Sequence, residues 1–142
     1  MNRIIKAMLV CTAVGIAACA SESRSIKELT EYFRQFYEEG RTEELLGLVY
    51  GFPDIEYRET IEWLFTFGAG DLKIQSLEIR PHDADPPEGF GPFETTMEGV
   101  EFNLDYQYLF YAHAVNEGDE WRLAWPVAEH GRHWYFAGLR KE

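Results

Sequence analysis

Cysteine is scarce in this sequence, and both copies lie near its beginning. The 142 residues contain Cys11 and Cys19, and none lies between residues 20 and 142. A disulfide within residues 20–142 is therefore excluded, although small exported domains often contain one. Because 46% of the chain is apolar and 15% aromatic, we expect this part to fold around a core held by packing alone.

Basic residues are also few. The chain has 13 lysines and arginines against 25 aspartates and glutamates, which gives a formal net charge of −12. A surface this acidic repels phosphate backbones and anionic headgroups, so we expect no nucleic-acid binding. The charge either keeps the domain dispersed in solvent or marks a cationic ligand, and net charge alone favours the first interpretation.

The chain begins with the layout of an export signal. Arg3 and Lys6 form a basic head, a short apolar stretch follows, and small residues then lead to Cys19. This layout is typical of a secretory signal. The apolar stretch is well short of the ~20 residues that a membrane-spanning helix needs, so we do not expect a retained transmembrane anchor.

The segment Ile16-Ala17-Ala18-Cys19 resembles the lipobox of bacterial lipoprotein signals. The resemblance implies that residues 1–18 are removed, that Cys19 becomes the acylated first residue, and that residues 19–24 tether it to the domain. Two or more acyl chains hold a protein stably on a membrane. Because Ala20 is not the aspartate that retains many such proteins at the inner membrane, the resemblance implies an outer-membrane position facing the periplasm. Ordinary signal-peptidase cleavage near the same residues is the alternative.

Residues 25–142 are predicted to form a single α+β domain that begins with helices. The segment Ser25-Ile26-Lys27-Glu28 is a capping box, and apolar residues then recur at spacings of three and four until Gly40. Thr42 and Asp54 are expected to cap two further helices.

The second half of the domain alternates with a period of two, which predicts strands. The alternation changes phase at Gln75-Ser76, which predicts a β-bulge, and Pro126 predicts a sheet edge or a second bulge. A hairpin turn is expected at residues 116–119. The predicted strands are residues 72–79, 100–110, 121–127 and 134–139.

The order of these elements resembles the nuclear transport factor two-like superfamily, as does the late strand that begins Asp119-Glu120-Trp121-Arg122-Leu123. The resemblance implies N-terminal helices packed on a curved antiparallel sheet of four to five strands, which together form a cone. The superfamily usually has a short strand between its second and third helices, and residues 51–57 match it poorly. A cystatin-like or another helix-plus-meander arrangement therefore stays open.

Asp105 and His113 are the candidate acid–base residues. Enzymes of that superfamily place aspartate, histidine or tyrosine inside the cone, and these two residues lie on the matching strand. Both alternate with the apolar positions, so we expect their side chains to point away from the core. A solvated or hydrogen-bonded His113 is therefore favoured over a catalytic one.

We expect no metal site and no cofactor. His130 and His133 flank a predicted turn next to Glu129, but this spacing does not make ligands converge in a turn as it does in a helix. Residues 80–89 are acidic but contain three prolines and lack the ligand spacing of a calcium-binding loop, so they predict a solvated loop.

Aromatic side chains are the remaining candidates for function. Tyr106, Tyr108, Trp125 and Trp134 could line a ligand-binding cleft, although at this density such residues more often fill a core. The leading hypothesis is a non-catalytic, membrane-tethered module that binds an apolar small molecule or an envelope protein. The alternative is a cofactor-free acid–base enzyme of the isomerase, dehydratase or hydrolase type. No nucleophile signature and no phosphate-binding loop is present.

Overall fold

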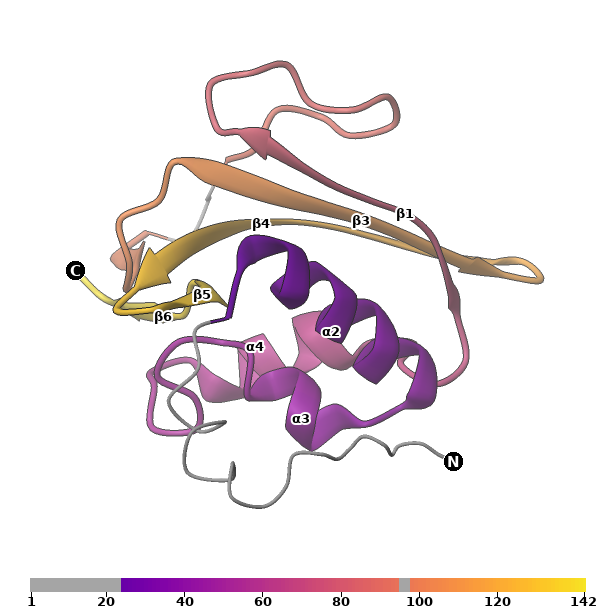
Figure 1. The fold of residues 1–142 in the computed structure, drawn as a ribbon, viewed down its shortest axis with the longest axis horizontal. Helices are drawn as coiled ribbons and strands as arrows, with labels where there is room; N and C mark the ends of the chain where they lie inside the picture. The colour runs from indigo at the N-terminus through magenta and orange to yellow at the C-terminus, as the bar shows by residue number, and fades with distance from the viewer. Residues whose placement is uncertain (1–23, 95–97) are drawn as a thin grey trace.

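The computed structural model describes residues 24–94 and 98–142 (Figure 1). Helices come first and strands follow, which confirms the α+β class. The proposed export signal, Cys19 and most of the proposed tether lie outside the described residues. The elements are α2 (Ile26–Glu39), α3 (Thr42–Leu46), α4 (Arg58–Thr66), β1 (Lys73–Pro81), β2 (Val100–Phe102), β3 (Tyr108–Asn116), β4 (Asp119–His130), β5 (His133–Phe136) and β6 (Leu139–Lys141).

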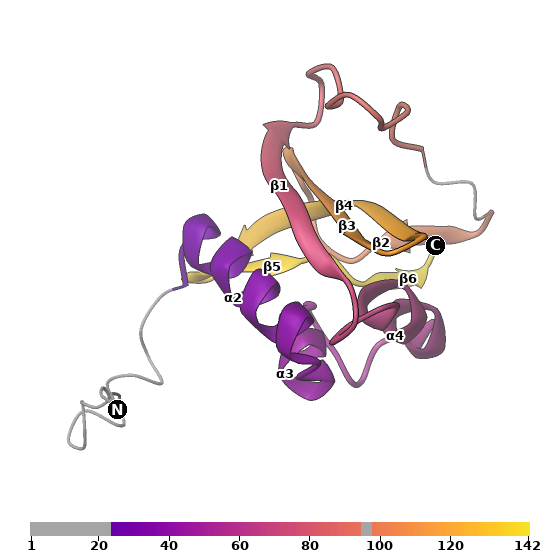
Figure 2. The ribbon, with the colours of Figure 1, turned by 90° about the vertical axis from the view of Figure 1, so that its right-hand side faces the viewer.

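Four strands form the main sheet in the order β1-β3-β4-β5, and every neighbouring pair is antiparallel. Strands β2 and β6 form a second, two-stranded antiparallel sheet. The long strands β3 and β4 arch over α2, and the three helices lie together on one side of the main sheet (Figures 1 and 2). No helix in the described part of the chain is long and apolar enough to cross a membrane.

Helix α2 supplies the centre of the core. Its capping box is present, because the Ser25 hydroxyl accepts from the Glu28 amide and the Glu28 carboxylate accepts from the Ser25 amide. Gly40 ends the helix with a φ of 70°, which a side chain would disfavour. On the buried stripe, the ring of Phe33 packs at 4.8 Å from Phe110 of β3. The predicted helix and its inward face are therefore confirmed.

The bulge in β1 is also confirmed. Ile74 pairs with Ala114, whereas Ser76 pairs with His113, so one residue of β1 is unmatched between them. This extra residue turns the second half of the strand over, which places Leu77 rather than Ser76 on the core face. The sequence shows the bulge because its apolar residues change phase at that point.

The single strand predicted for residues 100–110 is wrong. The chain forms β2, leaves the strand conformation at residues 103–107, and then enters β3 in the other sheet. Asn103 fixes this break, since its Nδ2 donates to the Tyr50 carbonyl at 2.9 Å and its Oδ1 accepts from the Gly138 amide at 2.7 Å. The period-two pattern continues across the break and therefore hides it.

The expected caps of the second and third helices are wrong as well. Thr42 is the first residue of α3 rather than its cap, and Arg41, which occupies the cap position, makes no side-chain capping hydrogen bond. Helix α4 begins at Arg58 instead of near Asp54. Glu56 forms an isolated antiparallel bridge with Leu139, so long-range pairing holds the chain extended before the helix starts.

Pro126 lies inside β4, at the point where pairing with β5 ends. Register with β5 stops at Val127 opposite Phe136, and the Pro126 carbonyl accepts from the Ala137 amide at 3.0 Å. The nitrogen and carbonyl of one strand residue face the same neighbour, so the missing N–H faces the end of β5 rather than β3. Pro126 therefore interrupts the pairing of β4 with β5 only, and the pairing of β4 with β3 continues past it.

The loop after β1 is largely exposed over residues 80–89, as predicted, but Phe90, the next residue, packs on the outer face of the sheet. The ring of Phe90 packs edge to face on Tyr111 at 5.0 Å. Leu109 and Tyr111, which face away from the helices, are each only 2% exposed. An apolar outer face needs a cover, and the loop supplies it with a residue beyond the three prolines.

Candidate ligand-binding recess

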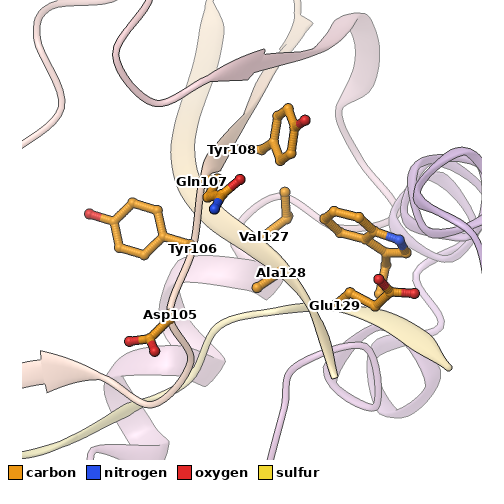
Figure 3. A pocket seen from close by; sticks show the side chains of 8 residues that line it. Asp105, Tyr106, Gln107, Tyr108, Val127, Ala128 and Glu129 are labelled. Carbon is orange, nitrogen blue, oxygen red and sulfur yellow. The ribbon is translucent and has the colours of Figure 1, made fainter. Parts of the chain in front are cut away.

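An open recess of about 390 Å³ lies at the end of the main sheet, between the start of β3 and the β4–β5 hairpin (Figure 3). We call it the recess. Its wall consists of the segment that precedes β3, the first residue of β3, and the ends of β4 and β5. The lining residues are Asp105, Tyr106, Gln107, Tyr108, Val127, Ala128, Glu129 and Trp134.

Strand register places three of these side chains on one face. Tyr108 pairs with Val127, and Glu129 pairs with Trp134. Because alternate residues of a strand share a face, Tyr108, Glu129 and Trp134 lie on the same face as Val127, whose side chain is buried in the core. The recess is therefore the uncovered end of the face that packs on the helices.

The rings of Tyr108 and Trp134 form an aromatic corner. Their centroids are 5.9 Å apart with an interplanar angle of 65°, an edge-to-face arrangement. Tyr108 is 37% exposed, so part of its ring remains open to a ligand. This corner is the main apolar surface of the recess.

Asp105 and Tyr106 lie on the other side of the segment from Tyr108 (Figure 3). The ring of Tyr106 packs edge to face on Phe102 at 5.6 Å and on His82 at 5.9 Å. These contacts hold the segment in place although it belongs to no strand. Tyr106 thus joins the recess to the long loop after β1.

Trp125 does not line the recess. It is 6% exposed and packs edge to face on Phe65 of α4 at 5.5 Å and on Phe102 at 5.4 Å. Its indole Nε1 donates to the Ala137 carbonyl at 2.7 Å, which satisfies the buried donor. The structure therefore brings Tyr106, Tyr108 and Trp134 to one cavity and leaves Trp125 in the core.

The recess is acidic. Asp105 and Glu129 are both exposed, and the eight lining residues include no lysine, arginine or histidine. Asp105 also lines two neighbouring cavities of about 340 and 470 Å³. Arg140 borders both of these cavities and is paired with Glu101, so its charge is already balanced there.

His113 lies far from this site in the fold, on the outer face of the sheet. Its Nε2 is 2.7 Å from Oε2 of Glu120, and Arg122 approaches the other oxygen of the same carboxylate at 2.8 Å. The hydrogen bond from His113, followed by the one from Arg122, lowers the pKa of Glu120 below its ordinary value. The two candidate acid–base residues, Asp105 and His113, are thus on different surfaces.

The histidines of the β4–β5 hairpin have aromatic partners. His130 Nε2 is 3.2 Å from the hydroxyl of Tyr50, and the ring of His133 stacks on Tyr135 at 6.0 Å. Among the residues that the structure describes, no group of three or more histidines, cysteines, aspartates or glutamates is arranged to hold a metal ion.

Arg24 belongs to the fold, not to the tether to which the sequence assigned it. Its amide donates to the Arg132 carbonyl at 3.1 Å, and its own carbonyl accepts from the Trp134 amide at 2.9 Å. Its guanidinium donates to the Trp134 carbonyl at 3.0 Å and lies 4.9 Å from the centre of the Tyr135 ring. Burial lowers the pKa of Arg24. The chain therefore enters the domain beside the recess, a feature that no local sequence signal reveals.

Comparison with protein-family models, curated proteins and solved structures finds no match to this chain. The geometry of the recess and of the chain entry at Arg24 is therefore the basis for a functional interpretation.

Proposed function

We propose that this protein is a lipid-anchored component of the bacterial cell envelope whose domain binds a small molecule in the recess. The observation that carries the binding proposal is the recess itself. Its volume of about 390 Å³ falls in the usual range for small-molecule sites, and it combines aromatic surface with a few polar groups. For the fold, we keep the cone of the nuclear transport factor two-like superfamily as a proposal.

The position of Arg24 supports the link between anchor and recess. Arg24 is held against Trp134, a lining residue of the recess. Four residues lie between Cys19 and Arg24, so the two are five residue steps apart, and a fully extended chain of that length spans at most about 18 Å. With lipid on Cys19, the β4–β5 end of the domain stays close to the membrane surface. The recess would then receive ligands at or near that surface, in our proposal at the outer membrane facing the periplasm.

The alternative of a cofactor-free acid–base enzyme receives less support from the geometry. The lining residues of the recess contribute carboxylates but no histidine, cysteine or serine. His113 is engaged with Glu120 on the outer face, so it cannot act together with Asp105 on one substrate. We therefore propose binding rather than catalysis as the main role of the recess.

The anchor is tested by two matched cysteine substitutions. We expect Cys19→Ser to abolish incorporation of an alkyne-tagged fatty acid and to release the protein from the membrane fraction. Cys11→Ser is the control, because the proposed cleavage removes Cys11, and it should be labelled like the unchanged chain. Equal labelling of Cys19→Ser and the unchanged chain would contradict lipidation at Cys19.

A further inference from the structure

The aromatic corner of the recess has the geometry to hold a cation. Tyr108 and Trp134 meet edge to face at 5.9 Å, so the two rings present surfaces in different directions. The faces of tyrosine and tryptophan rings attract a cation within about 6 Å, and alkylated ammonium groups are typical ligands of such corners. A neutral apolar ligand would use the same surface but would gain nothing from the ring quadrupoles.

Carboxylates stand next to this corner. Glu129 pairs directly with Trp134 across the hairpin, and Asp105 lies at the other side of the recess (Figure 3). Neither carboxylate forms a salt bridge within residues 24–94 and 98–142. Their charges are therefore available to a ligand.

The cationic side chain that hydrogen-bonds the Trp134 carbonyl, Arg24, lies on a different face. The Arg24 guanidinium lies over the ring of Tyr135, which alternates with Trp134 and so lies on the opposite face of β5. The recess thus has negative charge and aromatic faces without a compensating cation of its own.

We propose that the recess binds the alkylated ammonium group of a small organic cation, such as a quaternary ammonium compound. This inference rests on the proposed binding function and specifies its ligand class. Ring faces contact the alkyl groups of the ligand, and Glu129 balances its charge. The acidic domain as a whole also attracts cations toward the recess. The ammonium group can belong to a free metabolite or to the headgroup of a zwitterionic lipid.

The test uses the full chain in nonionic detergent micelles, because zwitterionic detergents carry ammonium groups themselves. The NMR signal of the Trp134 indole is followed during titration with choline and with its neutral isostere, 3,3-dimethyl-1-butanol. We expect choline to shift the Trp134 signal and to bind roughly three- to tenfold more tightly than the isostere. Trimethylacetate, an anion of similar shape, should not bind.

A pair of charge-neutralising variants locates the site. Glu129→Gln should weaken choline binding by roughly three- to tenfold, because it removes a carboxylate beside the aromatic corner. Glu117→Gln, in the β3–β4 turn at the other end of the strands, removes the same charge and should leave binding within twofold. Equal weakening by both variants would mean that overall charge, not the recess, attracts the cation, and would overturn the inference.

The outcomes separate the inference from the proposed function. Equal binding of choline and 3,3-dimethyl-1-butanol at Trp134 would overturn ammonium recognition but leave small-molecule binding in the recess intact. Absence of any shift at Trp134 with every probe, in a folded chain, would overturn both. If ammonium is preferred, glycerophosphocholine identifies its source, since binding as tight as that of choline indicates a lipid headgroup and weaker binding indicates a free cation.

Discussion

The face of the main sheet that packs on the helices has two ends. A helix covers one of them and leaves the other open. Phe110 and Tyr108 lie on the same face of β3, two residues apart, yet Phe110 is 0% exposed and Tyr108 is 37% exposed. Phe110 packs on Phe33 of α2, whereas Tyr108 has Trp134 as its aromatic neighbour. Both ends carry aromatic rings with polar groups, since Trp121 and Trp125 of β4 are buried at the covered end. Aromatic content alone therefore does not distinguish the core from the open recess; coverage by a helix does.

The comparison predicts that two alanine substitutions on β3 lower the free energy of unfolding by very different amounts. Phe110→Ala should lower the free energy of unfolding by about 3–5 kcal/mol, because it opens a cavity in the covered core. Tyr108→Ala should cost less than about 1 kcal/mol, since the ring is partly exposed and borders a recess that is already open. Urea unfolding followed by circular dichroism measures both values. Similar losses for the two variants would break the distinction between the two ends.

The pH dependence of the free energy of unfolding tests the covered end alone, because Tyr37 is buried there. Burial, followed by the charge of Asp71, raises the pKa of Tyr37 from 10.0 to about 12. An acid whose pKa is raised on folding stabilises the fold below its unfolded pKa, so this contribution is lost as the pH rises from about 10 to 12. The loss amounts to roughly 2–3 kcal/mol.

Tyr37→Phe provides the control for that dependence. It removes the hydrogen bond from the Tyr37 hydroxyl to the Phe67 carbonyl, 2.7 Å long, and should cost about 1–2 kcal/mol at pH 8. Urea unfolding between pH 8 and 12 should show a shallower alkaline decline in the variant. Parallel pH curves would show that Tyr37 is not the group that titrates.

A substitution at Asn103 tests the open end through a smaller loss in the free energy of unfolding. Asn103→Ala leaves the Tyr50 carbonyl and the Gly138 amide without their side-chain partner, and should cost about 1–2 kcal/mol. Because Asn103 precedes the recess segment, the variant should also increase hydrogen exchange at residues 104–107 more than in β4. Unchanged exchange there would contradict the role of Asn103 in fixing the recess wall.

The sequence predicted those features that depend on residues close together in the chain. The capping box at Ser25, the phase change at Ser76 and the hairpin around Gly118 all depend on neighbouring residues, and all are present. The break at Asn103 and the late start of α4 at Arg58 depend on partners 35 to 83 residues away in sequence. Alternation and caps carry no information about such partners.

The candidate site was predictable only in part for the same reason. Alternation and aromatic content indicated Tyr106, Tyr108 and Trp134 as possible lining residues, but gave Trp125 the same standing. Only its contacts with Phe65 of α4 show that Trp125 is core. Neither the coverage by α2 nor the distant hydrogen bonds of Arg24 could be inferred from a period of two.

We propose that the uncovered end of the sheet, rather than another exposed aromatic surface, binds small molecules. Trp63 on α4 is the strongest competitor, since it is 65% exposed and packs near Phe67 at 5.9 Å. The decisive measurement is an NMR screen of a small-fragment library against the full chain, which follows the assigned indole signals of Trp134 and Trp63 together. We expect binding fragments to shift Trp134 and to leave Trp63 unchanged. Fragments that shift Trp63 and not Trp134 would contradict the claim.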